Sequence, residues 1–149
     1  VNGRKVYGGG GIMPDVFVPA DTSDYSDYYR SLVRRGILNA FALEYYDKNR
    51  KNLAADYKTF EDFRNRFTLS QDEIKSLISK AEEAGIKYDD DQFTISGKAI
   101  RSVIKALIAS NQWQTNEYFM TLNEDDTVID KARQMLNDTA DYDRILGKE

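Results

Sequence analysis

The sequence predicts a mainly α-helical protein, in which a helical bundle-like C-terminal domain follows a short two-strand β segment. Both prolines and most of the glycines lie within the first 20 residues, so that stretch cannot form a regular helix. From residue 21 onward proline is absent, and apolar residues recur at steps of three and four, as on one face of a helix. We therefore predict two parts, residues 1–20 and residues 21–149.

The first part contains two short extended segments, residues 5–7 and 16–18, on either side of the glycine run 8–11. Two short strands do not make a stable sheet in water by themselves. We therefore expect this part to need a partner sheet, either against the helices that follow or in polypeptide outside these 149 residues.

The helical part begins with side-chain oxygens at residues 21–24 that can cap a helix carrying apolar positions from 25 to 33 and ending near Gly36. Residues 37–46 form a second apolar stripe, which stops at the polar stretch 47–52. That polar stretch makes residues 47–58 the expected mobile connection.

Three further helices follow from cap signals and apolar spacing. Thr59 is placed to cap a short helix that carries Phe60, Phe63 and Phe67. Residues 70–84 begin with a capping box and end before Gly85, which is placed for a C-terminal cap. Residues 94–110 carry the most apolar stripe of the chain, so we expect them to form the central helix.

The remainder predicts shorter helices. Residues 113–120 indicate a short helix or turn, and residues 128–136 an amphipathic helix behind Asp125 and Asp126. Residues 142–146 are compatible with a last turn. No fixed-period repeat or low-complexity tract interrupts residues 21–146, which we interpret as one helical unit.

Composition excludes several classes of function. With 21 Lys and Arg against 25 Asp and Glu, the 149-residue chain has a formal charge of −4, which disfavours attraction of the whole molecule to polyphosphate. The absence of Cys and His excludes disulfides, thiolate catalysis and histidine bases or ligands. Only Ser/Lys, carboxylate or tyrosine chemistry remains. No run approaches the roughly 20 apolar residues of a membrane span.

Two Ser/Lys pairs have helical spacing, Ser76 with Lys80 and Ser102 with Lys105. A serine nucleophile without histidine needs a lysine base whose pKa is lowered by burial. Both pairs fall on the polar sides of their predicted helices, where a lysine stays hydrated and protonated. We therefore interpret them as solvated faces and assign no catalytic residue.

Other motifs resemble binding sites only in part. The glycine run lacks a following helix, so it predicts a turn, and Ser96-Gly97-Lys98 lacks the glycine and strand of a phosphate loop and reads as a capped helix start. The acidic clusters 89–91 and 124–126 lack the calcium-loop spacing and fit helix N-termini. We predict no cofactor and no metal.

Charge is uneven along the chain. Residues 30–66 carry nine Lys and Arg against five Asp and Glu, and the sign reverses after residue 111. Such asymmetry suits docking of an acidic partner or of the other end of the same domain. An ordinary mixed surface is the simpler interpretation.

One motif near the start is similar to a known family. Gly3-Arg4, a short extended segment, the glycine run and Gly11-Ile12-x-Pro14-Asp15 follow one another at the spacing seen at the end of the protease domain in carboxyl-terminal processing (tail-specific) serine peptidases. The helical remainder is loosely similar to the tails of family members from Bacteroides-like bacteria. The residues that carry the resemblance are Gly3, Arg4, Gly11, Ile12, Pro14 and Asp15.

The resemblance implies a periplasmic or cell-envelope endopeptidase as the parent, with a Ser/Lys dyad and no metal or cofactor. Its catalytic serine, its lysine and its PDZ module would all precede Val1, so no catalytic role transfers to this chain. The tail would pack against the protease domain, mediate self-association or present protein substrates. One alternative is a free-standing helical adaptor, and a second is a small enzyme that uses carboxylates or a Ser/Lys pair.

Overall fold

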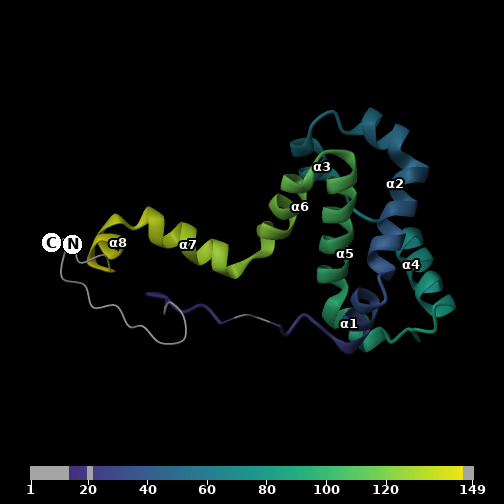
Figure 1. The fold of residues 1–149 in the computed structure, drawn as a ribbon, viewed down its shortest axis with the longest axis horizontal. Coiled ribbons are helices and arrows are strands. Elements are labelled where there is room, and N and C mark those ends of the chain that lie inside the picture. The colour runs from purple at the N-terminus through teal and green to yellow at the C-terminus, as the bar shows by residue number, and fades with distance from the viewer. Residues whose placement is uncertain (1–13, 20–21, 146–149) are drawn as a thin grey trace. The chain divides into compact units, whose positions relative to one another are not determined.

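A computed structural model describes residues 14–19 and 22–145, and all regular secondary structure in these ranges is helical (Figure 1). This confirms the mainly α prediction. The predicted β segment finds no support, because residues 16–18 form no strand and residues 5–7 lie outside the described ranges. The described residues divide into two compact units, residues 22–124 and a smaller unit that contains residues 14–19 and 125–145. The predicted boundary after residue 20 stays a prediction.

The first helix of the larger unit, α1, spans Asp27–Arg34. Its N-cap is Ser26, whose Oγ accepts the Tyr29 N–H at 3.3 Å, so the prediction of a cap within residues 21–24 was wrong. Residues 22–25 form a turn instead, in which the Tyr25 N–H donates to the Thr22 carbonyl at 3.1 Å. Gly36, at φ 68°, separates α1 from the next helix in a left-handed conformation that suits glycine.

Helix α2 spans Ile37–Asp56 without a break, so the prediction of a mobile connection over residues 47–58 was wrong. The polar stretch contains neither Gly nor Pro, and the helix continues through it to reach Leu53, which is buried. Local contacts support the polar turns, since the Asn49 amide donates to the Tyr45 carbonyl at 2.9 Å. A short polar run is therefore tolerated when an apolar anchor lies beyond it.

Helices α3 (Phe60–Arg66) and α4 (Gln71–Glu83) begin where the sequence predicts. The Thr59 side chain accepts the Asp62 N–H at 3.2 Å, and Ser70 and Glu73 form the predicted capping box. Gly85 follows α4 at φ 78°, which is the left-handed position expected after a helix. Local capping chemistry was sufficient to place both helices.

Helix α5 (Asp90–Gln112) is the longest helix of the described chain and packs against α1, α2 and α6 (Thr115–Leu122) (Figure 1). It begins four residues before the predicted start, because the Asp89 side chain accepts the Gln92 N–H at 3.0 Å and caps it there. Ile100, Ile104 and Ile108 are fully buried along its length. The prediction of a central helix is confirmed.

Aromatic rings fill one end of the core. The Phe63 ring stacks on Phe67 at a centroid distance of 4.5 Å and lies 5.3 Å from Trp113, which ends α5. The Phe63 side chain has no exposed surface. These contacts join α3 to the end of α5 through large apolar groups.

The smaller unit contains α7 (Thr127–Asn137) and α8 (Thr139–Ile145). The predicted helix behind Asp126 is confirmed, with the Asp126 carboxylate accepting the N–H groups of Val128 and Ile129 at 2.8 and 3.2 Å. No residue of α7 is buried.

Residues 17–19 and one face of α7 line a shallow hollow within this unit. The α7 residues in it recur at helical spacing and are Thr127, Asp130, Lys131 and Gln134. The apolar stripe of α7, which includes Val128 and Leu136, lies on a different face of the helix. Both apolar side chains are exposed.

Candidate functional site

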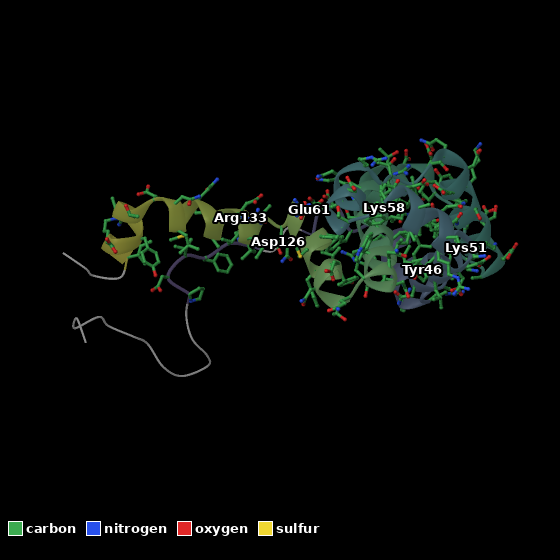
Figure 2. The ribbon with its side chains drawn as sticks, turned by 90° about the horizontal axis from the view of Figure 1, so that it is seen from above. Tyr46, Lys51, Lys58, Glu61, Asp126 and Arg133 are labelled. Carbon is green, nitrogen blue, oxygen red and sulfur yellow. The ribbon has the colours of Figure 1, made fainter. Side chains whose placement is uncertain are left out.

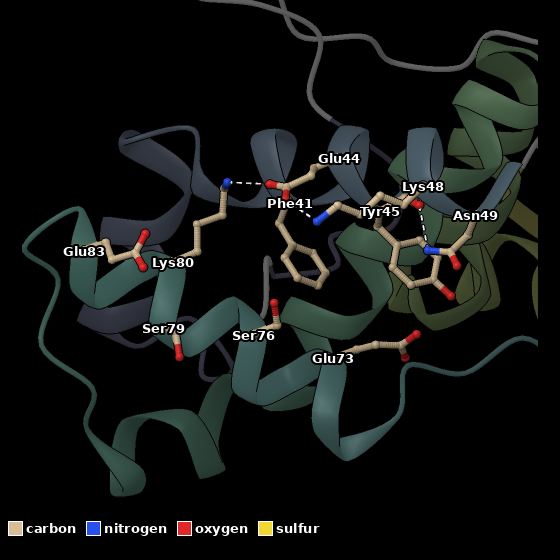
Figure 3. A pocket seen from close by; sticks show the side chains of 10 residues that line it. All are labelled: Phe41, Glu44, Tyr45, Lys48, Asn49, Glu73, Ser76, Ser79, Lys80 and Glu83. Carbon is tan, nitrogen blue, oxygen red and sulfur yellow. Dashed lines mark hydrogen bonds and ion pairs between the residues drawn. The ribbon is translucent and has the colours of Figure 1, made fainter.

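The candidate site is a groove between α2 and α4 in the larger unit, with a volume of about 260 Å³ (Figure 3). Its lining is polar apart from an aromatic floor and combines carboxylates, ammonium groups and hydroxyls. The lining residues are Phe41, Glu44, Tyr45, Lys48, Asn49, Glu73, Ser76, Ser79, Lys80 and Glu83.

Glu44 is the charge centre of this groove. Its Oε1 lies 2.7 Å from the Lys48 Nζ, one turn further along α2, and its Oε2 lies 2.7 Å from the Lys80 Nζ on α4. The hydrogen bonds from Lys48 and then Lys80 lower the pKa of Glu44 from its ordinary 4.5 to about 2. One carboxylate therefore holds two ammonium groups and ties α4 to α2.

Tyr45 and Glu73 form the second polar contact of the groove. Burial, followed by the charge of the Glu73 carboxylate and its hydrogen bond with the phenol, raises the pKa of Tyr45. Glu73 also accepts the Ser70 N–H in the capping box of α4. The Tyr45 hydroxyl therefore stays protonated at neutral pH and is not available as a base.

In both candidate Ser/Lys pairs, the lysine donates a hydrogen bond to a group other than the serine. Lys80 binds Glu44, as described above, and the Lys105 ammonium donates to the Arg64 carbonyl at the end of α3, at 2.5 Å. Arg101 similarly donates to the Leu69 carbonyl at 3.2 Å. Lys105 is half-buried rather than solvated as predicted, because it caps the C-terminus of a neighbouring helix.

The Ser96-Gly97-Lys98 motif is not the helix start that the sequence predicts. It lies in the second turn of α5, where Ser96 is fully buried. The Ser96 Oγ accepts the Ser26 N–H at 2.8 Å and donates to the Ser26 Oγ at 2.7 Å. The Gln92 side-chain carbonyl accepts the Tyr28 N–H at 2.7 Å, so two α5 side chains cap α1.

The acidic clusters lie at helix N-termini, as the sequence predicts. Asp89 and Asp126 are the N-caps of α5 and α7. The backbone and side-chain hydrogen bonds from Gln92 lower the pKa of Asp89. Among the described residues, no three acidic side chains converge into a group that could hold a metal ion.

The basic and acidic regions of the larger unit meet directly. Arg64, within the basic region, pairs with Glu61 and with Glu124, each at 3.1 Å. Other basic side chains of this region remain on the surface, including Lys51 on α2 and Lys58 between α2 and α3 (Figure 2). Part of the charge asymmetry is thus neutralised within this unit.

The motif of the peptidase resemblance is described only at its end. Pro14 and Asp15 lie in a segment without regular secondary structure, with Asp15 in a bend, and Gly3, Arg4, Gly11 and Ile12 lie outside the described residues. The groove around Glu44 was missed by the sequence analysis. The spacing of Glu44 and Lys48, four residues apart on a helix, was the available signal for half of its ion cluster.

Residues 28–114 match the family of unknown function DUF8443, and because they make up more than half of the chain, the chain belongs to this family. The match extends from α1 to the N-cap of α6 and includes the whole candidate groove. No curated protein and no solved structure matches the chain. Among the described residues, no helix is long and apolar enough to cross a bilayer.

Proposed function

We propose that this chain is the non-catalytic helical C-terminal domain of a bacterial carboxyl-terminal processing serine endopeptidase. The observation that carries the proposal is the spacing of Gly3-Arg4 and Gly11-Ile12-x-Pro14-Asp15, which is similar to the end of that protease domain. The parent enzyme would act in the periplasm or cell envelope. In it, the extended segments within residues 1–20 would complete the sheet of the protease domain.

The contacts of the lysines support a non-catalytic role. A Ser/Lys dyad needs a neutral amine against the serine hydroxyl. Lys80 donates to a carboxylate at 2.7 Å and Lys105 to a backbone carbonyl, so both side chains already donate to acceptors other than a serine hydroxyl.

An exposed apolar face supports a role in docking or assembly. Val128 and Leu136 lie on α7 with 47% and 64% of their surfaces exposed. Helices with a continuous apolar stripe usually bury it against another element. The protease domain of the same parent is the proposed surface, with self-association and substrate presentation as the further roles of the tail.

Two experiments test this proposal. The coding sequence upstream of Val1 should contain a serine motif followed by a lysine motif; a start codon at Val1 would instead favour a free-standing helical adaptor. In the parent enzyme, removal of residues 127–145 should reduce cleavage of an unstructured protein substrate or change its assembly, as measured by peptide release and sedimentation. Unchanged cleavage and assembly would contradict a docking role.

The matched control is a parent enzyme in which the serine of the upstream motif is replaced by alanine. This control should lose cleavage and keep assembly, which separates the chemistry from the docking. Peptide cleavage by the isolated 149-residue chain, abolished by Lys80→Ala or Lys105→Ala, would overturn the proposal in favour of a small enzyme.

A further inference from the structure

The smaller unit differs from the larger one in having no buried side chain among its described residues. Every described side chain in residues 14–19 and 126–145 is exposed or half-buried. In the larger unit, by contrast, each helix from α1 to α6 buries at least one residue. Burial of apolar surface is the main term that offsets the loss of conformational entropy when a chain folds. The described part of the smaller unit has no such core.

Helix α7 has few contacts that hold it closed. The Asp126 carboxylate caps its first turn, accepting the N–H groups of Val128 and Ile129 at 2.8 and 3.2 Å. Asp130 pairs with Arg133 at 3.4 Å, but both side chains are largely exposed, and exposed ion pairs add little stability. The helix has 11 residues, and isolated helices shorter than about 12–15 residues are only marginally stable in water. Local chemistry therefore sets where α7 begins without keeping it folded.

Helix α1 shows what holds a short helix in this protein. With 8 residues it is shorter than α7, but it buries Tyr28 and Leu32 in the core. Two side chains of α5 also bond to its start. Ser96 accepts the Ser26 N–H at 2.8 Å, and Gln92 accepts the Tyr28 N–H at 2.7 Å. No side chain of α7 is anchored in a core in this way.

We infer that α7 is a conditional helix, which opens and closes on its own while the unit of residues 22–124 stays folded. Opening exposes no buried residue, because the apolar stripe is already exposed in the helical form. The inference rests on the burial and length of α7 and does not depend on the peptidase proposal. In the docking role proposed above, α7 would complete its folding on contact, and the entropy lost at that moment makes the attachment weaker and readily reversible.

The test is amide hydrogen exchange of the full chain, resolved by residue with NMR. We expect the amides of residues 130–137 in α7 to exchange at least about 100-fold faster than those of residues 100–108 in α5. The reason is that a local opening needs far less free energy than unfolding of the core. Equal protection of the two helices would overturn the inference, since α7 would then open only together with the larger unit.

Low concentrations of urea separate the two kinds of opening. Denaturant accelerates exchange in proportion to the surface that an opening exposes. Exchange in α7 should therefore change little with urea, whereas exchange in the middle of α5 should rise steeply. A shared steep dependence would show that α7 belongs to the same cooperative unit and would also contradict the inference.

A substitution checks that the closed form is a helix. Ala132→Gly should accelerate exchange of the α7 amides about three- to fivefold, because glycine disfavours the helix relative to alanine. The matched control, Ala54→Gly at an exposed position of α2, should leave the α7 amides unchanged. Unchanged α7 exchange in Ala132→Gly would show that no helix closes there and would refute the inference.

Discussion

Helices α5 and α7 have similar apolar spacing and the same type of N-cap, yet they are held in different ways. Helix α5 begins at the Asp89 cap and buries Ile100, Ile104 and Ile108 completely. Helix α7 begins at the Asp126 cap and buries none of its residues. The comparison teaches that an amphipathic pattern predicts a helix and its apolar face, whereas burial depends on what surrounds that face.

The largest expected effect on the free energy of unfolding comes from a substitution in the core, and it is compared with a substitution on the exposed apolar stripe of α7. Phe63→Ala removes a fully buried ring and should lower the free energy of unfolding by about 3–5 kcal/mol. Leu136→Ala, at a 64% exposed site on α7, should change it by less than about 0.5 kcal/mol. Urea denaturation measures both, and a comparable loss in the two variants would show that α7 packs as firmly as the core.

A second prediction concerns the hydrogen bonds between α5 and α1. Ser96→Ala removes the buried acceptor of the Ser26 N–H and should cost about 1–3 kcal/mol of stability. Exchange of the Ser26 amide hydrogen should accelerate at the same time. The control is Ser79→Ala on the exposed side of α4, and protection of the Ser26 amide that survives in Ser96→Ala would refute the capping role.

A third prediction compares the caps of the two units. Ser70→Ala removes the capping box of α4 and should lower the stability of the whole larger unit by about 1 kcal/mol. Asp126→Ala should instead unfold α7 locally, because no buried side chain supports it, and leave the main unfolding transition unchanged. Amide exchange resolved by residue, together with urea denaturation, separates local from global loss.

The smallest expected effect is on the acid dependence of stability. Because the pKa of Glu44 falls from 4.5 in the ordinary state to about 2 in the folded protein, its carboxylate favours folding. This contribution is complete above pH 4.5 and is lost as the pH falls toward 2. Glu44→Gln should flatten the stability curve in that window. Equal curves for Glu44→Gln and the wild-type protein would remove the special role of Glu44.

Capping residues and apolar spacing predicted much of the fold. Thr59, Ser70 with Glu73, Gly85 and Asp126 each act as the sequence indicates, because caps bond to backbone groups two or three residues away. Predictions failed where a distant contact decided the outcome. Buried Leu53 extends α2 through a polar stretch, and Ser96 serves as a cap for α1, 70 residues earlier in the chain.

The sequence indicated only one of the two ion pairs in the candidate groove. The Glu44–Lys48 pair has the spacing of neighbours on one helix, but nothing local indicates that Lys80 reaches the same carboxylate from α4. This groove depends on how α2 and α4 are packed.

By itself the sequence determined the helical class, most helix termini and the exclusion of cysteine and histidine chemistry, since these depend on composition and on contacts within a few residues. Only the tertiary structure decided which stripe is buried, which lysine is bound and which aromatic rings remain at the surface. Those outcomes depend on side chains far apart in the chain, whose proximity arises from helix packing and is not encoded in any local pattern.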